Sequence, residues 1–360
     1  MQTVRRRLAA QRLTADPLDD SATVVAWLGA VQAQVFDEAK WSLGERTRSC
    51  TDADVESAFA RGEIVRTHLL RPTWHLVAAA DVRWLLRLTR PRVHALNRYY
   101  KDQHGLDAKL LARGERLLAR ALGDGEQLTR PEVAAHLAAG GVEASGPRLA
   151  YVLMHAELEE VICSGARRGK QHTYALLDRR VPRSPLDDLS RDVATEELVR
   201  RFFRSHGPAT VKDFTAWSSL TAAETKAALE RLGGQLQVEH DGTGTPWYAG
   251  PPAGPARRDR RAFLLPTYDE TIVGYQGLRT VPARPLGPGP FERVALVDGR
   301  VVGSWRRTLG PRRVTVELTA SGPVPDRDAG ALGSAARRLG RFLGTDSSLE
   351  IRGGPATIPA

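Results

Sequence analysis

The chain of 360 residues has few cysteines and no long apolar run. Its two cysteines, Cys50 and Cys163, are far apart and do not have a zinc-ligand spacing or suggest a disulfide framework. No apolar stretch approaches the roughly 18 residues that a membrane-spanning helix needs. The N-terminal stretch MQTVRRRLAAQRL is basic but lacks the apolar segment of a secretory signal. These absences predict a cytoplasmic protein with no membrane partner.

Most common enzyme signatures are also missing. The sequence has no GxxxxGK phosphate loop and no GxSxG serine elbow. Its nine histidines include no His-x-x-x-His pair with a partner glutamate. We therefore predict that the protein uses no metal and no cofactor.

The charge is strongly basic. The chain has 52 Lys and Arg against 42 Asp and Glu, which gives a net charge of +10 and a pI of about 10.0. Only six of the basic residues are lysines, so 46 are arginines, whose planar guanidinium forms two parallel hydrogen bonds to a phosphate. This composition favours nucleic-acid binding. The alternative is a genome-wide coding bias toward Arg and Ala.

The length predicts roughly two to four domains. In the first region, residues 22–31 and a segment that opens at Asp52 are expected to be helical, as are residues 80–89. Residues 64–77 contain β-branched residues around Pro72 and predict two short extended pieces.

One pattern occurs twice in the middle of the chain. Residues 128–177 and 209–250 each predict a short helix, a turn, a longer helix and a two-stranded hairpin. Thr129 with Glu132, and Thr221 with Glu224, have the spacing of capping boxes. This order is typical of a winged helix, whose hairpin touches the DNA backbone. The first hairpin tip is basic (Arg167, Arg168, Lys170), whereas the second, DGTG at 241–244, is acidic and small.

The character of the sequence changes after residue 250. PPAGPARRDRR reads as a linker, and residues 262–268, 291–305 and 313–318 predict strands. Asp298-Gly299 predicts a type I′ hairpin turn, residues 328–343 a helix, and residues 348–352 a last strand. We therefore predict a mainly helical α+β fold with winged-helix units at 1–100, 101–185 and 186–255 and a β-rich region at 256–360.

Three segments carry candidate functional residues. The first is Gln32-Ala33-Gln34, whose two glutamine side chains point the same way only if the backbone is extended or forms a turn, so the preceding helix must end near Val31. The second is RTHLLRPTWH at 66–75, and the third is LLPTYDE at 264–270. The candidates for DNA contact are Arg66, His68, Arg71, His75, Arg167, Arg168, Lys170, Tyr268, Asp269, Arg306 and Arg307. The histidines, and the Tyr268-Asp269 pair, also fit a purely structural role.

Five segments of the chain resemble the HTH_42 winged-helix family, which includes the AlkZ and YcaQ/AlkX bacterial DNA glycosylases: VQAQ, KWSLGERT, RTHLLRPTWHLV, LLPTYDETIVGY and LVDGRVVGSWRR. The resemblance extends from about Arg5 to Trp305. It implies tandem winged-helix units in a concave arrangement around DNA. It also implies removal of alkylated purines, including interstrand crosslinks left by genotoxic natural products.

The resemblance assigns catalysis to Gln32 and Gln34. The AlkZ branch carries a Gln-aliphatic-Gln motif, whereas the other branch ends the motif in Asp. The HLLRPTWH segment is similar to a widespread subgroup rather than to members from antibiotic clusters, which leaves open whether the role is general repair or self-resistance. A partner is implied too, namely double-stranded DNA with alkylated bases, and we expect a monomer.

A pair of amides suits this chemistry. A purine alkylated on a ring nitrogen is positively charged and leaves without a strong acid. A glutamine carbonyl could orient the attacking water and face the sugar cation, while its NH₂ contacts a phosphate or the sugar. A lyase reaction would need a lysine nucleophile, and none lies beside the motif, so we predict a monofunctional base-excision hydrolase.

Two other classes of function remain open from the sequence. One is a non-enzymatic winged-helix DNA-binding protein, such as a transcriptional regulator. The other is a protein-interaction module whose basic surface reflects coding bias. A regulator would prefer one undamaged sequence, and an interaction module would show no salt-dependent DNA binding.

Overall fold

The structure is a computed structural model that describes the chain except for residues 1, 253–260, 277–292 and 354–360. Its contacts divide the chain into two compact units. Unit 1 comprises Met1–Glu56, Arg200–Trp217 and Leu232–Ala360, and unit 2 comprises Ser57–Val199 and Ser218–Arg231. Neither unit is a continuous stretch, because the chain leaves unit 1 after Glu56 and returns at Arg200. The four consecutive domains expected from the sequence stay a prediction.

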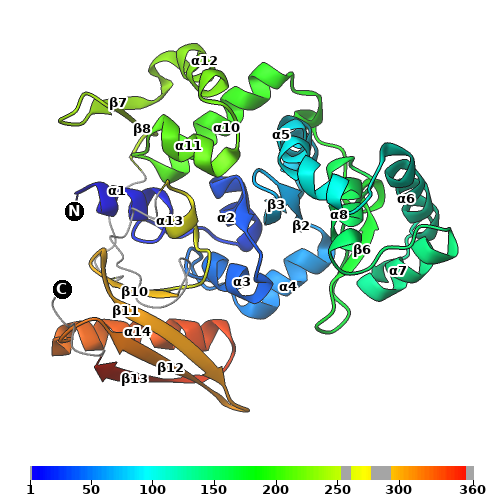
Figure 1. The fold of residues 1–360 in the computed structure, drawn as a ribbon. Coiled ribbons are helices and arrows are strands. Elements are labelled where there is room, and N and C mark those ends of the chain that lie inside the picture. The colour runs from blue at the N-terminus through cyan, green and yellow to red at the C-terminus, as the bar shows by residue number, and fades with distance from the viewer. Residues whose placement is uncertain (1, 253–260, 277–292, 354–360) are drawn as a thin grey trace. The chain divides into compact units, whose positions relative to one another are not determined.

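The N-terminal part of unit 1 is mainly helical (Figure 1). Asp20 caps the second helix by accepting a 2.7 Å hydrogen bond from the Thr23 amide, and Gly29 ends that helix at a φ of 83°. Positive φ is accessible to glycine at little cost, so the helix stops there. The elements are α1 (Gln2–Ala10), α2 (Ser21–Leu28), β1 (Val31–Gln32), α3 (Phe36–Gly44) and the start of α4 (Asp52–Arg61).

The C-terminal part of unit 1 is a five-stranded sheet in the order β13-β12-β11-β10-β9. Its strands are β9 (Ala262–Leu265), β10 (Val294–Val297), β11 (Arg300–Leu309), β12 (Arg313–Ala320) and β13 (Asp346–Gly353). Helix α14 (Asp326–Phe342) lies along the sheet and connects the parallel pair β12 and β13 (Figure 1). Leu8 and Leu13 pack against Phe263, Leu265 and Leu296 in one buried cluster, so the first residues of the chain are part of this core.

The hairpin predicted at Asp298-Gly299 is present. β10 and β11 are antiparallel, and Val297 pairs with Arg300 next to the turn. The two turn residues, Asp298 and Gly299, have φ values of 48° and 78°. The rest of the region follows the predicted order of strands and helix, with the short α13 (Glu270–Val273) after β9. The predicted linker at 251–261 and the start of the strand expected at 291 lie largely outside the described residues.

Unit 2 begins with an antiparallel hairpin, β2 (Ile64–Leu69) and β3 (Thr73–Ala78), on either side of Pro72 as predicted. Next come η1 (Ala79–Asp81), α5 (Val82–Gln103), α6 (Ala108–Ala121), β4 (Leu128–Thr129), α7 (Arg130–Ala139), α8 (Gly146–Leu158), β5 (Ile162–Ser164), β6 (Thr173–Leu176), α9 (Leu177–Arg180) and η2 (Pro185–Asp188).

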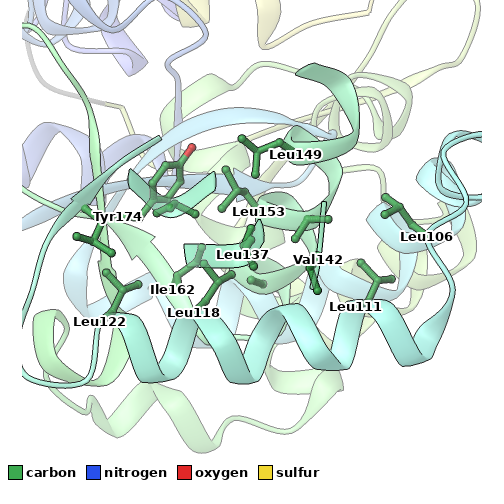
Figure 2. Close-up of a cluster of buried hydrophobic side chains, with 14 residues drawn as sticks. Leu106, Leu111, Leu118, Leu122, Leu137, Val142, Leu149, Leu153, Ile162 and Tyr174 are labelled. Carbon is green, nitrogen blue, oxygen red and sulfur yellow. The ribbon is translucent and has the colours of Figure 1, made fainter. Parts of the chain in front are cut away.

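Helices α6, α7 and α8 share one core with the small sheet β4-β6-β5. Figure 2 shows Leu111, Leu118 and Leu122 along one face of α6, directed into this core with Leu153 and Tyr174. The predicted capping box is present, since Glu132 accepts from the amide and hydroxyl of Thr129. The helix, helix and hairpin predicted at 128–177 are therefore confirmed as elements.

The second occurrence of the pattern also has its expected elements. They are α11 (Val211–Ser218), α12 (Ala222–Leu232), η3 (Gly233–Gln235), β7 (Gln237–His240) and β8 (Pro246–Ala249), after α10 (Arg191–His206). Glu224 accepts from the amide and hydroxyl of Thr221, which completes the second capping box. The fold is thus a mixed α+β fold, and whether its parts are winged helices in the strict sense stays a prediction. Among the described residues, every helix is too short or too polar to cross a membrane.

Candidate functional site

The glutamine motif directly follows a helix. Helix α2 ends at Leu28, before Val31 as the sequence required, and β1 covers Val31 and Gln32 but not Gln34. Gln32 is 8% exposed, whereas Gln34 follows in a bend and is exposed. The two amides therefore have different surroundings, with Gln34 the one open to a substrate.

A buried glutamate lies behind the motif. Glu270 is 0% exposed, and its Oε1 accepts a 2.9 Å hydrogen bond from the backbone N–H of Gln32. Its Oε2 accepts a 3.0 Å bond from the indole of Trp217 and lies 3.4 Å from Nε2 of His206. Both carboxylate oxygens are therefore acceptors, and one of them fixes the main chain of the motif.

The residue before Glu270 forms a second buried network. Both oxygens of Asp269 accept from Arg46, at 2.8 and 2.9 Å, and the side chains of Ser42 and Thr271 donate to them as well. The Asp269 carboxylate also accepts from the Thr271 amide and so caps α13, the helix that begins with Glu270. A further bond from Arg46 reaches Gln11, whose own amide donates to the carbonyl of Glu270.

The charges of this network follow from burial and pairing. Burial alone would raise the pKa of Asp269, but the charge of Arg46 and the hydrogen bonds outweigh it and lower that pKa. Burial would likewise lower the pKa of Arg46, and Asp269 reverses the effect. Burial lowers the pKa of His206 below its ordinary value, so its imidazole is neutral at pH 7. The donors named above for the Glu270 side chain are consequently neutral groups.

This arrangement places a fully buried carboxyl group on the main chain of Gln32, two residues before the exposed amide of Gln34. A fixed carboxylate in a site that excludes water favours positive charge that develops nearby. Gln34 offers one carbonyl and one NH₂ group to whatever binds in front of it. Glu270 lies in the third candidate segment, but the sequence gives no sign of its role, because its contact with Gln32 joins positions 238 residues apart.

The predicted residues of the β2–β3 hairpin lie in unit 2 and are mostly buried. Arg66 is 8%, His68 6% and His75 0% exposed. The ring of Trp74 lies 3.9 Å from that of His68, and the Arg66 guanidinium lies 4.1 Å from the Trp74 ring. Burial lowers the pKa of Arg66 to about 10. These contacts favour a structural role for the three buried residues, while Arg71 at the turn is half-buried.

The remaining predicted residues differ in exposure, and among the exposed ones Arg168 pairs with Glu132 and Arg306 with Glu317. Arg168, Lys170 and Arg306 are exposed, and Arg167 and Tyr268 are half-buried. Arg307 is 9% exposed and donates to Glu38, and Asp269 is held by Arg46. We therefore assign Asp269 and Arg307 to the framework of unit 1 rather than to a DNA surface.

A pocket of about 410 Å³ lies elsewhere in unit 1. One side of the pocket is formed by α3 and the segment that follows it, and the other side by the end of α14. Its lining does not include Gln32, Gln34 or Glu270. The candidate site is therefore the exposed Gln34 and its support rather than this pocket.

Comparisons with known proteins identify a family for this chain. The family described as "DNA glycosylase AlkZ-like" matches residues 25–342. A Streptomyces sahachiroi protein named "Interstrand DNA cross-link repair glycosylase" is 24% identical over 358 residues, which cover 89% of this chain and 90% of that protein. The solved structure of Streptomyces sahachiroi DNA glycosylase AlkZ matches with a TM-score of 0.74 and 21% identity over 98% of each chain, a likeness in fold.

Proposed function

The chain belongs to the AlkZ-like DNA glycosylase family, and on that premise we propose that it hydrolyses the N-glycosidic bond of alkylated purines in duplex DNA. One observation carries the proposal: Glu270 holds the main chain of Gln32 while Gln34 stays exposed two residues on. The motif is thus fixed on one side and accessible on the other, as a group that orients a reactant must be.

The proposed reaction needs no strong acid. The bond between the sugar C1′ and the base nitrogen breaks, and its electron pair goes to the base, which leaves as a neutral molecule because it began as a cation. Water adds to C1′ and loses a proton to solvent. Gln34 orients this water through its carbonyl oxygen, and the charge of Glu270 favours the sugar cation.

A lyase step is not part of the proposal. Lys40 is the lysine nearest the motif in sequence, and its ammonium lies 2.9 Å from Asp52 and 2.7 Å from Glu56. Burial would lower the pKa of Lys40, but these carboxylates raise it. A charged, paired ammonium is a poor nucleophile, so the enzyme is expected to leave an abasic site without cutting the strand.

DNA contact is proposed for the exposed cations among the predicted set. Arg168 and Lys170 lie at the β5–β6 tip and Arg306 on β11. Lys170→Ala should lower the affinity for all DNA sequences alike and should reduce the slope of log affinity against log salt by about 1. The name of the Streptomyces relative makes crosslinked DNA a substrate to include, and we propose that bulky adducts and crosslinks are released by the same site.

The test is base release from duplex DNA methylated at N7 of guanine or N3 of adenine, and from a crosslinked duplex. Gln34→Ala should reduce the single-turnover rate by about 10²–10³, the scale of one lost transition-state contact. Gln237→Ala, an exposed glutamine on β7, is the matched control and should keep the wild-type rate. The proposal fails if wild type releases no base from any substrate, and sequence-selective binding to undamaged DNA would then favour a regulator.

A further inference from the structure

A second group of polar side chains lies in unit 2, between three helices. His94 and Lys101 are on α5, Glu115 is on α6, His155 is on α8, and Glu159 is at the end of α8. We predicted no metal ligands from the sequence, because no two histidines have the spacing of a metal-binding pair. Here the two imidazoles come from helices far apart in sequence, and their ring centroids lie 5.2 Å apart.

Each imidazole has a carboxylate on one nitrogen and faces the same ammonium with the other. Nε2 of His94 lies 2.7 Å from Glu159, and Nε2 of His155 lies 2.8 Å from Glu115. Nζ of Lys101 lies 3.0 Å from Nδ1 of His94 and 3.3 Å from Nδ1 of His155. An ammonium only donates, so both Nδ1 atoms present lone pairs, and each Nε2–H donates to its carboxylate.

This is the arrangement that histidines adopt around a bound metal. A ligating imidazole presents one nitrogen to the ion and donates its other N–H to a carboxylate, which fixes the tautomer and the ring plane. In unit 2 the Lys101 ammonium stands where that ion would be. One donor atom each from His94, His155 and Glu159 lies within 4.8 Å of the others. The side chains are also partly accessible, at 24%, 15% and 30% exposure, so an ion could enter.

We propose that this cluster is a binding site for a divalent transition metal of the zinc class, which Lys101 occupies as a tethered cation when no metal is bound. His94 and His155 are the nitrogen ligands through Nδ1, while Glu159 and Glu115 accept from their outer Nε2–H groups and orient the two rings. Two imidazoles suit Zn²⁺, Co²⁺ or Ni²⁺ better than Mg²⁺ or Ca²⁺, which prefer oxygen ligands. The bound ion would clamp α5 to α8 and stabilise unit 2.

Lys101 makes the proposal specific. Its ammonium competes with the metal, and Arg90 adds a second positive charge through its 3.0 Å pair with Glu159. Removal of the competitor should therefore tighten binding, whereas removal of a true ligand should weaken it. A network that serves only as packing would show neither effect.

The test is titration of the tag-free full chain with Co²⁺, followed by its absorption, and with Zn²⁺, followed by calorimetry and the thermal unfolding midpoint. Wild type should bind one ion, and Lys101→Met should bind it about tenfold more tightly. His94→Ala and His155→Ala should each bind at least about tenfold more weakly. His136→Ala, an exposed histidine on α7, should match wild type.

The proposal is overturned if Lys101→Met binds metal no better than the His94→Ala/His155→Ala double variant. It is overturned equally if Mg²⁺ produces the same stabilisation as Zn²⁺. Because Lys101→Met keeps both histidine ligands and adds no charge, this variant gives an answer even if a histidine variant folds poorly. Circular dichroism of each variant before titration checks its folding.

Discussion

Glu270 in unit 1 and Glu157 in unit 2 are both fully buried, and each lies behind a segment that the sequence singled out. Glu270 accepts from the Gln32 amide through Oε1 and from the Trp217 indole through Oε2, which also lies 3.4 Å from Nε2 of His206. Glu157 accepts from the backbone and ring of His68 through Oε2 alone, and its Oε1 has no hydrogen-bond partner among the described residues. Burial alone therefore does not show how much the fold depends on a carboxylate. The number of its oxygen atoms that accept hydrogen bonds is the better guide.

The largest effect is expected from Asp269, which extends the unit 1 network next to Glu270. Asp269→Asn should leave Arg46 buried with an incomplete partner, since an amide cannot accept from the guanidinium on both atoms. The free energy of unfolding should fall by about 3–5 kcal/mol. Chemical denaturation followed by tryptophan fluorescence measures it. A loss below 1 kcal/mol, on the scale of an exposed pair, would contradict the role assigned to this pair.

Acid should weaken the same pair in part. Because the pKa of Asp269 is lowered in the folded protein, the unfolded chain takes up this proton at a higher pH. The stabilisation is thus present in full above the unfolded pKa of about 3.9 and is lost as pH falls through the lower folded pKa. Unfolding midpoints between pH 5 and 3 should fall less steeply for Asp269→Asn than for wild type. Identical slopes would show that another carboxylate dominates the acid response.

The next effect concerns Glu270→Gln, which keeps the shape but replaces one acceptor with an NH₂ group. That group must face a donor, either the Gln32 amide or the Trp217 indole. The substitution also removes a hydrogen bond to a charged acceptor, which contributes about 1.5–3 kcal/mol. If this energy positions the motif during the reaction, the rate of base release should fall by about tenfold to hundredfold. Single-turnover kinetics well below the unfolding temperature measure this rate.

The binding of undamaged DNA should stay unchanged in Glu270→Gln, which separates positioning of the motif from DNA affinity. A wild-type rate in this variant would remove Glu270 from the mechanism. A matched loss of DNA affinity would indicate a wider disturbance of unit 1.

The smallest effect is expected from Glu157→Gln in unit 2. The amide oxygen can take over the bonds of Oε2 to His68, and the new NH₂ can occupy the place of the unpartnered Oε1. The free energy of unfolding should change by less than about 1 kcal/mol, and base release should be unaffected. If this variant were as damaging as Glu270→Gln, the difference between the two glutamates would disappear.

Local features of the fold could be predicted from the sequence. Both capping boxes and the turn at Asp298-Gly299 depend on residues two or three positions apart, and the structure contains all three. The proposed role of the glutamine motif required a helix end before Val31. The structure has this end at Gly29, where the backbone adopts a positive φ. These features can be predicted because the residues that form them lie within a few positions of one another in the sequence.

Features that join distant segments could not be predicted in this way. Nothing near Gln32 indicates that its amide bonds to Glu270, and nothing near His94 indicates that His155 will approach it. The sequence also does not show which segments form each unit. Unit 1 combines the first 56 residues with Arg200–Trp217 and Leu232–Ala360, which are far away in the chain. The candidate motif was accessible from the sequence, but its support was not.

The distance along the chain between Gln32 and Glu270 has a consequence for biosynthesis. The motif leaves the ribosome early, but the carboxylate that fixes it follows 238 residues later. Residues 57–199 form most of unit 2 and are synthesised before Glu270. Most of unit 2 can therefore fold before the last segments of unit 1 have been made. A nascent or prematurely terminated chain would therefore contain the glutamines without the carboxyl group that holds them, and the proposed site would be complete only after Glu270 has been made.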